Sequence, residues 1–179
     1  MRTLHFPAVV CLLSLSLCAA GQTAAPAPAH PCEGDPAYHK LDFWVGHWDV
    51  FDNHDGSKGG TDAVEKILEG CAVTEDWHEL SPDGADGKSL FYYQKATGQW
   101  KQVWVTAVGP MKEKQLVEEF KDGGVRFQGE IPHLKGGSHL DRTTLTPLGR
   151  DRVHQVIEIS RDGGKTWETV FDAEYRRQK

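Results

Sequence analysis

The sequence lacks the short motifs that identify several large classes of enzyme. It contains no Gly-x-Ser-x-Gly nucleophile elbow, no phosphate-binding loop and no glycine fingerprint for a dinucleotide. It also contains no Cys-x-x-Cys pair, which disfavours a thiol redox enzyme and a thiolate zinc site. No reaction can be named from a motif, so the functional argument has to start from the architecture.

Positive charge is scarce and scattered. Lys and Arg total 20 against 26 Asp and Glu, which gives a formal net charge of −6, and there is no basic run. Such a chain is a poor partner for nucleic acid or an anionic membrane surface, because both select for clustered positive charge. No apolar stretch of membrane length follows the first 20 residues, so we expect no transmembrane segment in the mature chain.

The N-terminal residues have the order of features typical of a secretory signal. Arg2 supplies a positive charge, residues 6–17 are mainly apolar, and small residues follow at Ala19 and Ala20. We expect a signal peptide at 1–20, with cleavage as late as residue 25, and a flexible Ala/Pro-rich lead-in at 21–37. A domain at 38–179 would then belong to a secreted or periplasmic protein.

Removal of the signal would leave two cysteines, Cys32 and Cys71. In an oxidising compartment two cysteines suggest one disulfide, here between the lead-in and a strand about 40 residues later. The alternative is two separate buried thiols.

Ten short runs with strand-like alternation follow one another at roughly ten-residue spacing, with Gly-containing turns between them. A possible helical turn at 38–44 precedes them. This pattern predicts an all-β domain, a single up-and-down antiparallel barrel of about ten strands, since closure removes the exposed edges of an open sheet. The expected strands are 48–53, 61–68, 71–79, 89–94, 100–107, 115–121, 124–130, 139–146, 152–160 and 166–175.

Alternation also predicts which side chains share a face. Trp100, Gln102 and Trp104 fall on one face of their strand, and Glu75 and Trp77 share a face of another. On the last strand we expect one face to carry the aromatic residues Trp167, Phe171 and Tyr175. If these faces point inward, the interior mixes large rings with a carboxyl group, which favours a wet cavity over a dry core.

The segment Gly46-His47-Trp48 resembles the opening of the first strand in lipocalin-like, or calycin, barrels. In that superfamily the glycine permits a tight backbone, the tryptophan plugs the barrel base, and a basic residue near the chain end lies across the indole. Arg176 and Arg177 follow the last expected strand here, and we assign the stacking role to Arg176.

More of the chain is similar to a group of uncharacterised secreted bacterial proteins with a lipocalin-like domain. The similarity lies in residues 41–50, 75–77, 98–104 and 160–167. It implies export and a barrel but no reaction. The haem-binding relative nitrobindin has further glycines after the first tryptophan and a histidine ligand near its end. This chain has Asp49-Val50-Phe51 and no histidine in its last strand, so we expect no cofactor.

Residues 160–167 also fit the Asp-box pattern Ser-x-Asp-x-Gly-x-Thr-Trp. The pattern predicts a hairpin in which Asp162 accepts turn amides, Gly164 takes a positive φ, and Trp167 packs beneath the turn. A sialidase-type propeller repeats this box in each of its four or more blades, whereas this chain has one copy. We therefore interpret the box as a structural turn.

We expect a small, partly apolar ligand in the barrel interior. The residues we assign to it are Glu75, Trp77, Tyr93, Gln102 and Trp104, although each could equally be packed core. Two alternatives remain, namely a barrel enzyme that uses Glu75 as general acid or base and an envelope interaction protein whose barrel is filled. We expect no metal site, because the histidines are scattered; they are His39, His47, His54, His78, His133, His139 and His154.

Overall fold

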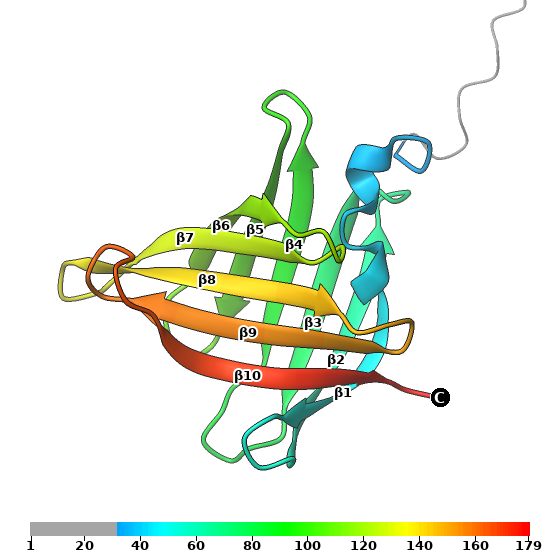
Figure 1. Ribbon diagram of the computed structural model, residues 1–179. Coiled ribbons are helices and arrows are strands. Elements are labelled where there is room, and N and C mark those ends of the chain that lie inside the picture. Colours follow the sequence, from blue (N-terminus) through cyan, green and yellow to red (C-terminus); the bar gives the residue numbers. More distant parts are fainter. Residues whose placement is uncertain (1–31) are drawn as a thin grey trace, which may run out of the picture.

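The computed structural model describes residues 32–179, which form a closed barrel of ten antiparallel strands (Figure 1). Each strand pairs with its neighbours in sequence, and β1 pairs with β10 to close the sheet. Two short 3-10 helices, η1 (Pro36–His39) and η2 (Asp42–Trp44), come first. The strands are β1 (Gly46–Asp52), β2 (Lys58–Ile67), β3 (Ala72–Glu79), β4 (Gly87–Gln94), β5 (Gln99–Thr106), β6 (Lys112–Glu119), β7 (Val125–Pro132), β8 (Ser138–Pro147), β9 (Arg152–Ser160) and β10 (Glu168–Arg177).

The fold class expected from alternation and turn residues is confirmed, and a closed antiparallel barrel is consistent with the calycin-like resemblance. All ten expected strands are present, with ends that differ by at most three residues. No helix within residues 32–179 is long and apolar enough to cross a membrane. The expected signal peptide lies outside the described residues.

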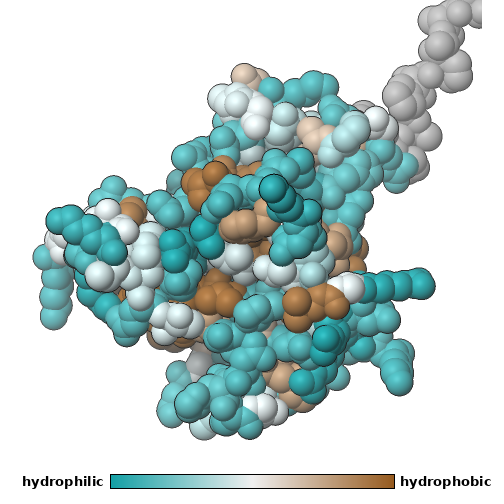
Figure 2. Space-filling view, in the orientation of Figure 1, coloured by the Kyte–Doolittle hydropathy of each residue, from teal (hydrophilic) through white to brown (hydrophobic). Residues whose placement is uncertain are grey.

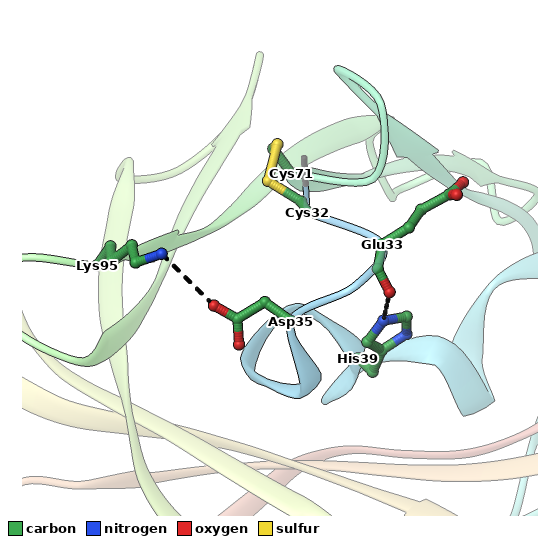
Figure 3. The surroundings of a disulfide bond; sticks show 6 residues. All are labelled: Cys32, Glu33, Asp35, His39, Cys71 and Lys95. Atoms are coloured by element: carbon green, nitrogen blue, oxygen red, sulfur yellow. Dashed lines mark hydrogen bonds and ion pairs between the residues drawn. A yellow bond between two sulfur atoms is a disulfide. The ribbon is translucent and has the colours of Figure 1, made fainter. Parts of the chain in front are cut away.

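The chain before β1 is tied to one end of the barrel. The disulfide between Cys32 and Cys71 is confirmed, and it joins this segment to the turn between β2 and β3 (Figure 3). With a sequence separation of 39 between its two cysteines, such a cross-link contributes about 4 kcal/mol in the chain-entropy model. Residues 32–37, the described part of the expected lead-in, are therefore covalently fixed to the barrel.

Polar contacts hold the same segment in place. His39 donates from Nε2 to the Glu33 carbonyl at 2.8 Å, and Asp35 lies 3.7 Å from the Lys95 ammonium, as Figure 3 shows. The indole of Trp100 in β5 donates to the Ala37 carbonyl at 2.8 Å. The two 3-10 helices thus close this end of the barrel.

Beneath the closed end lies the apolar core. Trp44 and Phe91 meet edge to face with ring centroids 5.5 Å apart, and Phe91 meets Phe127 in the same way at 5.3 Å. Burial of each large apolar side chain contributes about 1.5–3 kcal/mol. The buried residues of this cluster include Leu41, Trp44, Trp48, Val50, Val64, Val73, Phe91, Trp100, Val125, Phe127, Leu145, Val153, Ala173 and Tyr175.

The basic residue that covers the plug tryptophan is Arg177, so the assignment of Arg176 was wrong. The guanidinium of Arg177 lies 4.1 Å from the ring centroid of Trp48, whereas Arg176 lies over Phe51 on the outside. Alternation explains the difference, because Arg177 is opposite Trp48 in the β1–β10 ladder and shares the inward face of buried Tyr175.

Gly46 makes room for this contact. Its φ is +149°, and a Cβ there would lie 2.0 Å from Nη1 of Arg177, the atom that donates to the Val45 carbonyl at 3.0 Å. The glycine of the Gly-x-Trp pattern is therefore required by the arginine as well as by the backbone.

A β-bulge changes the face on which Trp167 lies. The β9–β10 register shifts between Thr169 and Phe171, which reverses the side-chain alternation at that point. Trp167 therefore does not share the inward face of Phe171 and Tyr175, and the expectation of one aromatic face was wrong. Instead the outward-facing guanidinium of Arg142 lies 3.8 Å from the ring centroid of Trp167.

We predict that Arg177→Ala lowers the free energy of unfolding by about 1–2 kcal/mol, because it removes the stack on Trp48 and the hydrogen bond to Val45. Arg176→Ala is the matched control and should cost about 0.5 kcal/mol or less, since that side chain is more than half exposed. Urea denaturation of both variants checks this. Equal losses in the two variants would contradict the assignment.

Candidate functional site

The barrel contains a cavity of about 430 Å³ at the end opposite the 3-10 helices. Its walls are apolar and come from four strands: Trp77 in β3, Trp104 in β5, Ile157 in β9 and Phe171 in β10. The Trp77 and Phe171 rings meet at a right angle, with centroids 6.1 Å apart. Loop residues complete the mouth; they are Asp83, Gly84, Ala85, Val108 and Pro110.

Two glycines determine where the tryptophan side chains lie. A Cβ at Gly60 would be 2.3 Å from the Trp77 ring, and a Cβ at Gly87 would be 2.1 Å from the Trp104 ring. Each indole therefore occupies the space above a glycine of a neighbouring strand. The rings line the wall and leave the centre of the barrel open.

A chain of hydrogen bonds runs along one side of the cavity floor. Gln102 donates from Nε2 to Ser89 Oγ at 3.2 Å, and Ser89 donates to Glu75 Oε2 at 2.5 Å. Glu75 is 5% exposed, and burial raises the pKa of its carboxyl to about 7, although the Ser89 hydrogen bond and the Lys114 charge oppose this rise. Within the described residues Gln102 Oε1 is buried without a hydrogen-bond partner.

Two lysines of the adjacent strand β6 continue this polar row, since Lys114 pairs with Gln102 in the β5–β6 ladder, and the two lysines share one carboxylate. Lys114 lies 2.5 Å from Asp141 and donates to Thr143 Oγ1 at 2.6 Å, while Lys112 lies 2.8 Å from the other Asp141 oxygen. Burial lowers the pKa of Lys114 to about 8. Burial alone would raise the pKa of Asp141, but the charges of Lys114 and Lys112 outweigh it and hold that pKa below its ordinary value.

A second buried carboxyl, Asp62, lies on the inner face of β2, between Trp48 and Trp77 of the neighbouring strands. Neither of its oxygens has a hydrogen-bond partner among the described residues. Burial, followed by the nearby Glu75 charge, raises its pKa well above the ordinary value. Burial therefore favours the neutral form of the Asp62 carboxyl.

The barrel brings together four of the five residues assigned to a ligand. Glu75, Trp77, Gln102 and Trp104 all line the cavity. Tyr93 does not, because it lies at the closed end, where its ring packs against Tyr38 and Trp100. Alternation predicts the inner face of a strand, but it does not predict the height along the barrel at which each residue lies.

Several polar residues of the cavity floor were not predicted from the sequence. Lys112 and Lys114 lie before the expected start of their strand at residue 115, and a charged stretch is usually exposed. The available signal was the alternation of Lys112, Lys114 and Leu116, which continues the strand towards its N-terminus. The other polar residues of the floor that were missed are Thr143 and Gln155, with Asp141 behind the lysines.

The Asp-box residues form the expected hairpin, outside the cavity. Asp162 accepts backbone hydrogen bonds from Lys165 at 3.0 Å and Thr166 at 2.9 Å. Hydrogen bonds, first from the Thr166 side chain, lower the pKa of Asp162 to about 2. Trp167 donates to the Gly164 carbonyl at 3.2 Å, and Gly164 has a φ of +90°.

Within residues 32–179, no group of three or more His, Cys, Asp or Glu side chains is arranged to hold a metal ion. Several histidines bind carboxylates on the barrel surface instead. His78 lies 3.0 Å from Asp86, and His154 lies 2.8 Å from Asp172.

The Glu75 carboxyl predicts a pH dependence of stability. Its pKa is about 7 in the folded protein against 4.5 ordinarily, so between these values the unfolded chain is ionised while the folded protein keeps the proton. The free energy of unfolding should therefore fall as the pH rises through this window, by on the order of 1 kcal/mol per pH unit. Chemical denaturation of wild type and Glu75→Gln at pH 5, 6 and 7 measures this, and an unchanged slope in the variant would contradict it.

Comparison with known proteins adds no family to this description. No family model matches the chain, and no curated protein is significantly similar to it in sequence. The functional argument therefore rests on the barrel and on the geometry of its cavity.

Proposed function

We propose that the protein is exported by its N-terminal signal peptide and binds a small, partly apolar ligand inside the barrel. The observation that carries this proposal is the cavity of about 430 Å³, which has aromatic walls and a polar floor. Small-molecule sites typically have volumes of about 300–1,000 Å³, apolar linings and a few polar groups that orient the ligand. The cavity has each of these properties.

The outside of the barrel supports an interior site. The face in Figure 2 is mostly hydrophilic, with apolar patches separated by charged and polar residues. The Cys32–Cys71 disulfide is compatible with an extracellular or periplasmic location.

Native mass spectrometry of protein purified from its own host tests the proposal. Ile157→Trp, on the inner face of β9, should place an indole inside the cavity, narrow it, and sharply reduce the amount of co-purifying small molecule. Val156→Trp is the matched control, since its side chain lies on the opposite face of the same strand, and it should retain the ligand. Failure of wild type to carry any ligand, or equal retention by Ile157→Trp, would refute the proposal.

A second candidate function is proton transfer by Glu75. It is favoured by one specific observation, a carboxyl that lines the cavity and has a pKa of about 7, near the value at which a general acid or base works best at neutral pH. The ligand recovered from the host should then take up deuterium from D₂O in the presence of wild type. Glu75→Gln should retain the ligand without exchange. Absence of exchange with wild type would eliminate this candidate.

A further inference from the structure

We propose that the cavity selects ligands with a single anionic group, a carboxylate or a sulfonate, which binds to Lys112 and Lys114 of β6. This inference rests on the proposed binding function and adds the charge of the ligand to it. The two lysines and the apolar walls lie in one cavity, so one molecule can contact both.

The charges inside the barrel do not balance without a ligand. Lys112 and Lys114 supply two positive charges, and their shared partner Asp141, which is 0% exposed, supplies one negative charge. Burial favours the neutral forms of Asp62 and Glu75, since it raises the pKa of Asp62 well above its ordinary value and that of Glu75 to about 7. One positive charge is therefore left over on a lysine pair of which Lys114 is almost fully buried and Lys112 is 25% exposed.

The two lysine ammonium groups also have N–H donors that are free to bind a ligand. Each ammonium has three N–H donors; both groups form ion pairs with Asp141, and Lys114 also donates one hydrogen bond to Thr143. Both residues line the cavity two positions apart on the same face of one strand. An oxyanion placed there can accept charge-assisted hydrogen bonds from both side chains.

The remaining acidic groups orient the ligand. Glu79 and Asp83 also line the cavity, but they belong to the end of β3 and the exposed loop after it, where solvent screens their charges. The anionic end should therefore point towards β6. The apolar part would then contact Trp77 and Phe171 across the barrel.

Two fluorescent probes with the same rings test this inference. 1-Anilinonaphthalene-8-sulfonate carries an anionic group, whereas N-phenyl-1-naphthylamine is neutral. We expect the sulfonate to bind wild type at least about tenfold more tightly, a ratio that corresponds to one good charge-assisted contact. Both probes should lose binding in Ile157→Trp, which confirms that they occupy the cavity.

Lys112 is the better residue to substitute, because the buried Asp141 carboxylate still forms an ion pair with Lys114 when Lys112 is replaced. Lys112→Met should weaken sulfonate binding about tenfold and leave the neutral probe within about twofold, while Lys112→Arg, which keeps the charge, should retain sulfonate binding. Lys88→Met is the matched control, because Lys88 is exposed on the outside of β4 and pairs with Asp76. It should change neither affinity.

The outcomes separate the two proposals. Equal affinities of the two probes for wild type, or equal losses in Lys112→Met, would overturn anion selectivity and leave the binding function intact. If neither probe binds wild type and no small molecule co-purifies with it, both proposals fail. Should Lys112→Met not fold, the comparison of the two probes on wild type and Lys112→Arg still decides.

Discussion

The pairing of β1 with β10 joins the two ends of the domain and turns ten strands into a closed wall. In this ladder Trp48 is opposite Arg177, and Val50 is opposite Tyr175. Without the closure, the inner faces of all ten strands would be exposed to water. The polar side chains of the cavity floor would then not be enclosed. The stack of Arg177 on Trp48 lies at this seam, so it stabilises the closure and the plug of the barrel together.

Along the barrel axis, the interior consists of three layers that differ in the polarity and packing of their side chains. The end beneath the 3-10 helices is packed with buried apolar side chains, whose burial stabilises the fold. The middle layer holds Glu75, Ser89, Gln102 and Lys114 and is stabilised by mutual hydrogen bonds and charge pairs. The mouth layer is aromatic and only partly filled. The apolar core and the proposed binding site thus lie at opposite ends of one fold.

Local alternation was sufficient to predict the strands and most of the inward faces, because a side-chain period of two is visible in the sequence itself. Features that depend on contacts between distant strands were not predictable. The register of β4 puts Tyr93 at the closed end, a bulge in β10 turns Trp167 outward, and Arg177 rather than Arg176 faces Trp48. Lys112 and Lys114 were missed because their burial depends on a partner, Asp141, that lies two strands away.

The glycines beneath Trp77 and Trp104 have a consequence for the thermodynamics of binding. Each indole lies directly above a glycine backbone of the neighbouring strand and borders the cavity, so its position depends on the missing Cβ. Under the proposed binding function, a ligand would find its aromatic contacts already in position and would lose little affinity to side-chain ordering. Substitution of Gly60 or Gly87 would displace a ring into the cavity, so these two small residues preorganise the site without touching a ligand.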